Sequence, residues 1–387
     1  MQPTGVLDSR TTKNPLKELL AYGQSMWLDY IRRDLFATGK LKQLIDDDGL
    51  RGMTSNPAIF EKAIADSSLY DDQLKSLASR TDLDTTARYE QIAIKDIQSA
   101  ADALRGVYDA SNARDGYVSL EVSPYLARKT QESIDEARRL WKAVDRPNVM
   151  IKIPGTAEGL PAIQQAIGEG ININITLLFS QQVYEQVAEA YIAGLEQLAA
   201  RGGNLKKMAS VASFFISRID SLVDSLLNEK LKATTDASQQ SQLKSLLGKV
   251  AIANGKLAYQ SYQRIFSGPR WQALAAKGAQ TQRVLWASTS TKNPAYRDVI
   301  YVEELIGPDT VNTMPPATID AFRDHGVVQT TLTKDVADAK KVMDDLARTG
   351  ISIKEATDKL TNDAVKLFAD AFDKLLAAVA KSTQQKG

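Results

Sequence analysis

The sequence predicts an α/β fold, a (β/α)8 TIM barrel with additional helices. Two observations predict it. Short apolar segments alternate with longer amphipathic ones over residues 26–325, which is typical of βα units that build a parallel sheet. The short segments number eight, the count of strands that closes such a barrel. They lie at residues 26–31, 50–56, 117–123, 149–154, 171–179, 208–215, 283–288 and 310–315.

The segments between these expected strands carry the features of helices. Residues 130–144 and 180–202 are amphipathic at helical spacing. Ser180 stands where a helix N-cap is expected, and Gly202 stands where the same helix should end. Both segments are therefore expected to cover the outside of the barrel.

Two stretches exceed what the barrel needs. Residues of about 230–280 are expected to form a helical insertion before the seventh strand, and residues of about 331–387 a helical C-terminal extension. No repeat, low-complexity run or Pro/Gly-rich linker interrupts residues 1–387, so one domain is expected. Apolar residues near the C-terminus repeat at helix spacing and predict a face that docks on the barrel or on a partner. They are Val365, Phe368, Phe372, Leu375, Leu376 and Val379.

The composition argues against several classes of function. The chain has 48 basic and 47 acidic residues, for a net charge of +1, so no overall field favours nucleic acid or an anionic membrane. It has no cysteine and a single histidine, His325, which stands where a helix should end. Thiolate catalysis, a serine-histidine triad, a histidine-rich metal site and a zinc-dependent aldolase are therefore disfavoured. Neither a metal nor another cofactor is expected.

The expected location is the cytoplasm. Residues 1–20 lack the apolar core of a signal peptide. No run approaches the roughly 20 apolar residues that a membrane span needs. The sequence leaves the oligomeric state open.

One lysine stands in the middle of an apolar strand segment, VMIKIP. Side chains of a strand alternate between its faces, so Val149, Ile151 and Ile153 share one face and Lys152 points the other way. An isolated strand lysine is often an edge residue in water. Inside a barrel, the same lysine would lie in the interior, where an unpaired charge is costly.

Three other strands repeat this alternation. Glu121, Asn174 and Asp29 each lie opposite an aliphatic face, as does Thr176, and all stand toward the C-terminal end of their strand. In a closed parallel barrel that end is the mouth where catalytic residues gather. Asn172 lies on the same face of its strand, and there the alternative is that a strand asparagine simply satisfies the backbone of a loop. The charged groups, by contrast, favour a functional site together with Lys152.

A lysine enclosed with carboxylates and amides suits imine chemistry. A desolvated amine gives up its proton more easily, attacks a carbonyl, and the resulting imine withdraws electrons. Neighbouring carboxylates can then move protons while a C–C bond breaks or forms.

Six motifs in order along the chain are similar to those of one enzyme family. From about residue 20 to the C-terminus the chain resembles the transaldolases, in their longer bacterial form, within the superfamily of class I Schiff-base aldolases. Any one motif is weak, but the six together, at the ends of successive strands, are specific. The motifs are GMTSNPAIF at 52–60, SLEVSP at 119–124, VMIKIPGT at 149–156, GININITLLFS at 170–180, SVASFFISRID at 210–220 and LWASTSTKNP at 285–294.

The resemblance implies four catalytic roles. Lys152 matches the lysine that forms the Schiff base with the C2 carbonyl of a ketose phosphate. Asp29 matches the acid/base that takes the proton of the C4 hydroxyl and returns it. Glu121 and Thr176 match the pair that positions a water for imine formation and hydrolysis.

It also implies residues that bind the sugar. Asn56 and Asn174 match the amides that hold the dihydroxyacetone hydroxyls. Arg218, with Ser213 nearby, matches the clamp on the phosphate. Position supports Arg218 independently, because it begins the helix after the sixth strand, where free backbone N–H groups favour an anion.

The expected phosphate site departs from the family pattern at one edge. Ser288 matches another phosphate contact. The shorter transaldolases have Ser-x-Arg here, beginning with that serine, and the long forms usually carry Gly at the position of Ser290. This chain instead has Ser290 and then Lys292. The sequence alone leaves open whether Lys292 or Ser290 completes the site.

The resemblance implies a transaldolase of the pentose phosphate pathway. Such an enzyme moves a dihydroxyacetone unit from sedoheptulose 7-phosphate or fructose 6-phosphate to erythrose 4-phosphate or glyceraldehyde 3-phosphate. A fructose-6-phosphate aldolase, which releases free dihydroxyacetone, is the near alternative. Those relatives tend to carry Gln at the position of Glu121 and Tyr at that of Phe215. A non-catalytic barrel used as a scaffold is the other alternative, which the buried charges disfavour.

Overall fold

Eight parallel strands close into a barrel in the computed structural model, which describes residues 14–386. The strands pair in chain order, and β8 closes the barrel on β1. The predicted (β/α)8 fold is thereby confirmed. The segment in which no signal peptide is expected lies mostly outside the described residues. The strands are β1 (Gln24–Asp29), β2 (Gly52–Thr54), β3 (Tyr117–Glu121), β4 (Val149–Pro154), β5 (Ile173–Leu178), β6 (Ser210–Phe215), β7 (Arg283–Ala287) and β8 (Thr310–Met314).

The strand limits follow from local chemistry. β4 has the predicted bounds, and all six of its residues are buried, as expected of a strand enclosed on both faces. β2 is shorter than predicted, with three residues. It ends early because Pro57 begins the next helix and the Asn56 side chain caps that helix.

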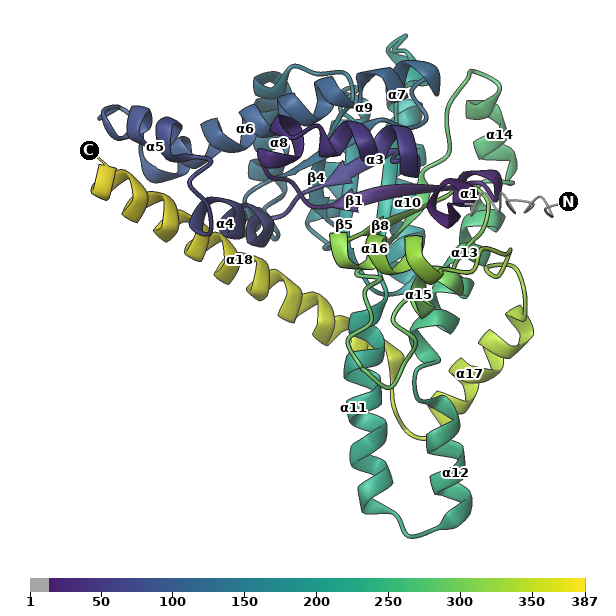
Figure 1. Cartoon of the computed structure of the whole chain (residues 1–387). Coiled ribbons are helices and arrows are strands. Elements are labelled where there is room, and N and C mark those ends of the chain that lie inside the picture. The colour runs from purple at the N-terminus through teal and green to yellow at the C-terminus, as the bar shows by residue number, and fades with distance from the viewer. Residues whose placement is uncertain (1–13, 387) are drawn as a thin grey trace, which may run out of the picture.

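Helices surround the barrel (Figure 1). The predicted helix at 130–144 has these bounds in the structure, and Ser180 caps the helix that follows β5. His325 is the last residue of its helix. The helices are α1 (Pro15–Ala21), α2 (Asp34–Ala37), α3 (Lys40–Asp48), α4 (Pro57–Ala65), α5 (Asp71–Ala78), α6 (Thr85–Ala103), α7 (Arg105–Ala110), α8 (Thr130–Val144), α9 (Gly159–Gly168), α10 (Gln181–Ala200), α11 (Ser217–Ala233), α12 (Ala237–Leu246), α13 (Val250–Ile265), α14 (Pro269–Ala275), α15 (Ile300–Glu303), α16 (Pro316–His325), α17 (Val336–Arg348) and α18 (Ile353–Lys386).

The helical insertion before β7 contains two kinds of helix. α12 and the end of α11 form a hairpin that projects away from the barrel (Figure 1). α13 instead packs against α10 and β7, so it belongs to the wall around the barrel. Its buried residues include Tyr259 and Tyr262, whose rings stack at 5.4 Å.

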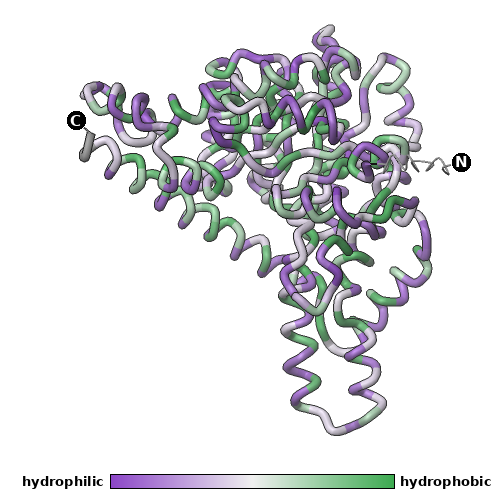
Figure 2. The backbone as a smooth tube through the Cα atoms, viewed as in Figure 1, coloured by the Kyte–Doolittle hydropathy of each residue, from purple (hydrophilic) through white to green (hydrophobic). Residues whose placement is uncertain are grey.

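The C-terminal extension ends in α18, a helix of 34 residues. It runs obliquely along the molecule and packs against α4, α5 and α6 (Figure 1). Figure 2 shows hydrophobic and hydrophilic residues interleaved along it, as expected of a helix with one buried face. Phe372 packs edge-on against Tyr89 of α6 at 5.7 Å, and Leu375 and Val379 are fully buried. The predicted apolar face therefore docks on this chain's own helices.

No helix within residues 14–386 is long and apolar enough to cross a membrane.

Candidate active site

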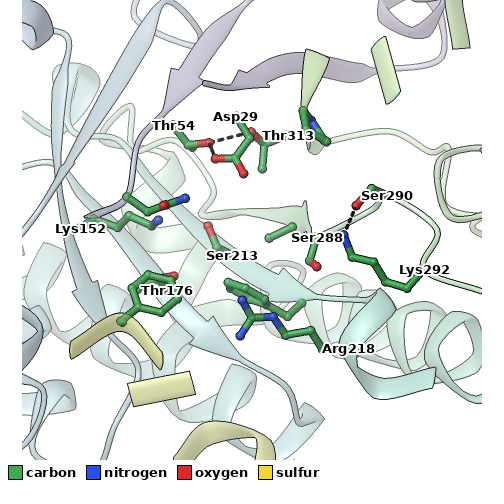
Figure 3. A pocket seen from close by; sticks show the side chains of 15 residues that line it. Asp29, Thr54, Lys152, Thr176, Ser213, Arg218, Ser288, Ser290, Lys292 and Thr313 are labelled. Atoms are coloured by element: carbon green, nitrogen blue, oxygen red, sulfur yellow. Dashed lines mark hydrogen bonds between the residues drawn. The ribbon is translucent and has the colours of Figure 1, made fainter. Parts of the chain in front are cut away.

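A cavity opens at the C-terminal end of the barrel strands (Figure 3). Its empty volume is about 710 Å³, counted to its open mouth. Seven of the eight strands or the residues directly after them line it, and α18 adds one aromatic side chain. The predicted site residues that line it are Asp29, Asn56, Lys152, Thr176, Ser213, Phe215, Arg218, Ser288 and Lys292.

Lys152 projects into the interior from the middle of the barrel wall. Its Cα pairs with that of Glu121 on β3 and that of Asn174 on β5. The ammonium donates a hydrogen bond to the Ser55 carbonyl at 3.2 Å, and its side chain is only 7% exposed. The amine is thus enclosed by protein but still reaches the cavity.

Glu121 lies beside this amine. Its Oε2 is 3.4 Å from Lys152 Nζ, and its side chain is 5% exposed. Burial raises the pKa of the Glu121 carboxyl, although the charge of Lys152 opposes the rise. Oε2 has no hydrogen-bond partner, and the buried Thr176 Oγ1 has none either. Such unpaired buried oxygens are where a bound water is expected.

Asp29 faces the same space from β1 (Figure 3). Burial raises the pKa of its carboxyl, opposed by the charge of Lys152 and then by a hydrogen bond from Thr54. Thr54 Oγ1 lies 2.7 Å from Asp29 Oδ1 and 2.8 Å from Thr313 Oγ1. Neither threonine is among the site residues predicted from the sequence, although each also lines the cavity.

The two predicted amides are placed differently. Asn174 is fully buried and does not line the cavity. Its amide donates to Ser119 Oγ at 2.9 Å and accepts from Ser213 Oγ at 2.7 Å, so it orients Ser213 in the wall. Asn56 lines the cavity, and its side-chain oxygen accepts from Ile59 N at 3.1 Å as the cap of α4.

Cationic groups gather at another part of the cavity. Figure 3 shows Arg218 reaching into it, with Ser288, Ser290 and Lys292 across from Lys152. Arg218 is the second residue of α11, so the partial positive charge of a helix N-terminus adds to that of its guanidinium. The predicted free N–H groups are partly used, because Ser217 N donates to the Ser288 carbonyl at 3.0 Å. Burial lowers the pKa of the Arg218 guanidinium, which stands 5.3 Å from the centre of the Phe215 ring. This end is therefore suited to a phosphate.

Hydrogen bonds fix the side chains of Ser288, Ser290 and Lys292, where the sequence departs from the family pattern. Ser288 has a φ of +56°, a strained value for a residue other than glycine, and its Oγ lies 2.9 Å from Ser217 Oγ. Lys292 is exposed and donates to Ser290 Oγ at 2.8 Å. Both Ser290 and Lys292 line the cavity, so each can contribute to an anion site.

An aromatic residue from the C-terminal helix completes the cavity. The centre of the Phe368 ring lies 5.9 Å from Lys152 Nζ, and the ring lines the cavity. The helical spacing of α18 predicts that Phe368 is covered, but not that it faces Lys152. This contact joins residues far apart in the chain.

No group of three or more His, Cys, Asp or Glu side chains within residues 14–386 could hold a metal ion. His325 lies at the surface, with its two ring nitrogens 2.9 Å from Asp298 and 3.0 Å from Asp324. The groups that line the cavity include the amine of Lys152, the carboxyl of Asp29 and the hydroxyls of Thr54, Thr176 and Ser213.

Comparison with known protein families shows which family has this barrel and this set of site residues. The family described as Transaldolase/Fructose-6-phosphate aldolase matches residues 26–379, which is nearly the whole chain. The chain belongs to this family. The matched residues include every residue that lines the cavity and all of the barrel except Gln24 and Ser25 of β1.

Curated relatives within the transaldolase/fructose-6-phosphate aldolase family match over almost their full lengths. "Transaldolase" of Trichodesmium erythraeum is 48% identical over 376 residues, which cover 96% of this chain and 98% of the relative. "Transaldolase 2" of Nostoc sp. is 50% identical over 366 residues, or 94% and 96% of the two chains. "Transaldolase 1" of Streptomyces coelicolor is 47% identical over 384 residues, or 99% and 98%.

Proposed function

We propose that the protein is a transaldolase, a transferase that moves a dihydroxyacetone unit between sugar phosphates through an imine on Lys152. The observation that carries the proposal is the enclosed amine of Lys152, 3.4 Å from Glu121 and facing a cavity with cationic groups at another part. Donors would be sedoheptulose 7-phosphate or fructose 6-phosphate, and acceptors erythrose 4-phosphate or glyceraldehyde 3-phosphate. This is the chemistry of the pentose phosphate pathway, and we place it in the cytoplasm.

The first step joins the sugar to the enzyme. Lys152 passes one proton to Glu121, 3.4 Å away, and the amine then attacks the C2 carbonyl of the ketose. The carbinolamine loses its hydroxyl as water to leave the iminium ion. Glu121 supplies the proton for the departing hydroxyl, through a water held by Thr176. The raised pKa of the Glu121 carboxyl suits a group that must carry a proton and give it up.

The second step breaks the C3–C4 bond. Asp29 removes the proton of the C4 hydroxyl, the C4 oxygen forms the aldehyde carbonyl, and the electron pair of the broken bond moves into the iminium to give an enamine. The aldose phosphate leaves. An acceptor aldehyde then adds to the enamine, Asp29 returns the proton to the new hydroxyl, and hydrolysis of the imine frees the product.

Other residues hold the sugar during these steps. Asn56 and Ser213 can bond the hydroxyls of the dihydroxyacetone unit, and Asn174 supports this by orienting Ser213. Arg218 and Lys292 would hold the phosphate, because both are cationic and both line the cavity. Binding of this kind keeps the enamine in register until an acceptor arrives.

The two alternatives are a fructose-6-phosphate aldolase and a barrel without catalytic activity. A fructose-6-phosphate aldolase would release dihydroxyacetone without an acceptor. Glu121 and Phe215 favour the transferase, because members that act as aldolases tend to carry Gln and Tyr at these positions. A scaffold without activity is disfavoured, because enclosed charges such as Lys152 and Glu121 weaken a fold, and a scaffold would not need them.

A coupled assay tests the proposal. Glyceraldehyde 3-phosphate is followed after addition of fructose 6-phosphate, with and without erythrose 4-phosphate. We expect turnover that depends on the acceptor, and no turnover in Lys152→Met. Borohydride added with fructose 6-phosphate should modify Lys152 in the natural chain. Acceptor-independent turnover would indicate the aldolase, and an unmodified Lys152 with no turnover would indicate the scaffold.

A further inference from the structure

A second hollow lies behind Glu121. It has an empty volume of about 310 Å³, counted to its mouth, and lies between α6, α8, the end of β3 and α18. Its walls are mostly apolar and include Tyr89, Ala93 and Phe372. Glu121 lines this hollow, and it is not among the residues that line the sugar cavity.

Glu121 therefore stands between two spaces. On one side its Oε2 is 3.4 Å from Lys152 Nζ, which lines the sugar cavity. On the other side the residue lines the hollow. The helix α18 is a wall of both, because Phe368 lines the cavity and Phe372, one turn later, lines the hollow.

The proposed reaction needs a water to move while the cavity is full. Each imine that forms releases one water, and each imine that is hydrolysed takes one up. The sugar phosphate is then covalently bound to Lys152 and occupies the cavity that leads to bulk solvent. A water that reaches Glu121 from behind avoids this obstruction.

The charges that line the hollow disfavour entry of the sugar phosphate. Glu90, Glu121 and Glu136 all line it, and they face only two cations, Arg139 and Lys152. The local net charge is therefore negative, which disfavours a phosphate anion but not a neutral water. Arg139 bridges Glu90 at 2.6 Å and Glu136 at 2.8 Å, and is itself 47% exposed, so this ion-pair cluster faces solvent. The cluster is where the hollow meets bulk water.

Tyr89 forms part of the wall of the hollow. Burial raises the pKa of its hydroxyl, and the charges of Glu121 and Glu90 add to the rise. The hydroxyl is thus within the field of both. Its ring packs against Phe60 at 5.8 Å and Phe372 at 5.7 Å, which holds the wall in place.

We propose that this hollow is a separate route by which water reaches and leaves Glu121, while the sugar phosphate enters and leaves through the main cavity. The proposal rests on the proposed transaldolase function. Water arriving by the hollow gives a proton to Glu121 as its oxygen attacks the imine carbon, and the reverse reaction returns that water to the hollow. C–C bond making and breaking need no water and are independent of the route.

Filling the hollow tests the proposal. Ala93 is buried on α6 and lines the hollow, so Ala93→Leu places three more carbon atoms in it. The enzyme is loaded with a dihydroxyacetone unit from fructose 6-phosphate, freed of glyceraldehyde 3-phosphate, and mixed rapidly with erythrose 4-phosphate in ¹⁸O-labelled water. Consumption of the aldehyde reports C–C bond formation, and ¹⁸O in the released ketose reports hydrolysis. We expect release to slow by at least about tenfold and aldehyde consumption to change by less than about twofold.

Two further variants separate the route from general packing damage. Ala100→Leu is the matched control, because Ala100 lies on the same face of α6 two turns later, is fully buried and does not line the hollow. Ser123→Leu fills the hollow from β3's end, in case Ala93→Leu does not fold. Normal release in folded Ala93→Leu or Ser123→Leu, or equal slowing in Ala100→Leu, would overturn the proposal. Failure of the natural chain to consume the aldehyde would instead reject the proposed function.

Discussion

Thr54 Oγ1 donates a 2.7 Å hydrogen bond to Asp29 Oδ1, and the same oxygen lies 2.8 Å from Thr313 Oγ1. A hydroxyl has one proton, so Thr313 must be the donor in the second contact. Three neighbouring strands, β8, β1 and β2, thus contribute one chain of hydrogen bonds that ends on the carboxylate. The chain fixes the direction of the Asp29 side chain and stabilises its charged form against burial.

Thr54→Val removes that donor at nearly constant volume. The hydrogen bond from Thr54 lowers the pKa of Asp29, so its loss raises that pKa further. Because Asp29 must be ionised to accept the C4 proton, the acid limb of the kcat profile should move to higher pH. Thr54→Ser should restore the profile. An unchanged acid limb in Thr54→Val would mean that this limb reports another group.

Asp29→Ala should separate imine formation from cleavage. Lys152 and Glu121 keep their 3.4 Å contact in this variant, so borohydride should still trap the sugar on Lys152. Cleavage should fall by about a thousandfold or more, since a positioned acid/base is missing. Mass spectrometry of the trapped enzyme and the release of glyceraldehyde 3-phosphate measure the two steps. Near-normal release would remove Asp29 from the mechanism.

The direction of the site residues could be predicted from the sequence because it depends on the backbone alone. Alternation along β4 places Lys152 opposite Val149 and Ile151, and the same alternation applies in β3 and β5. Pairing of the three strands then puts Glu121, Lys152 and Asn174 side by side. No knowledge of side-chain packing is needed for this step.

Contacts across the barrel could not be predicted in this way. Thr54 belongs to a strand of three residues, too short to show alternation, and its partner Thr313 is 259 residues away. Phe368 belongs to an apolar helical stripe, and such a stripe shows that a face is covered but not what covers it. The burial of Asn174 behind Ser213 likewise depends on the packed interior.

Arg218→Ala and Lys292→Ala should weaken phosphate binding unequally. Arg218 is partly buried at a helix N-terminus, whereas Lys292 is exposed, where its charge is screened by salt. We expect KM for fructose 6-phosphate to rise about 100-fold in Arg218→Ala and less than about tenfold in Lys292→Ala. Unphosphorylated glyceraldehyde as acceptor provides the control, since its KM should change in neither. A larger effect of Lys292→Ala would make it the main phosphate ligand.

Phe368→Ala should increase the release of free dihydroxyacetone in the absence of an acceptor. The ring lies 5.9 Å from Lys152 Nζ, so we expect it to shield the proposed imine on Lys152 from solvent. Without it, release of free dihydroxyacetone in the absence of an acceptor should rise about tenfold relative to transfer. Leu367→Ala is the matched control, because the neighbouring Leu367 is 54% exposed and does not line the cavity. Equal leakage in both variants would point to a general loosening of α18.

Asp220 ties α11, which carries Arg218, to the helices beside it. Its carboxylate accepts from Ala251 N at 2.7 Å and from the Tyr301 hydroxyl at 2.8 Å. Burial raises its pKa from 3.8 to about 6, and these hydrogen bonds only partly oppose the rise. Asp220 is therefore a carboxyl whose protonation should affect the stability of the fold.

The sign of that effect follows from proton binding. Between pH 4 and pH 6 the folded protein holds more protons at Asp220 than the unfolded chain, so the free energy of unfolding falls as pH rises through this window. A shift of about two units corresponds to a change of about 3 kcal/mol. Asp220→Asn lacks this ionisation. The unfolding free energy of the natural chain minus that of the variant should therefore become less positive, or more negative, from pH 4 to pH 6 and then stay constant. Urea unfolding at several pH values measures it, with exposed Asp344→Asn as the control for the loss of one surface carboxylate. A difference that does not change with pH would mean that Asp220 is ionised in the folded protein throughout this range.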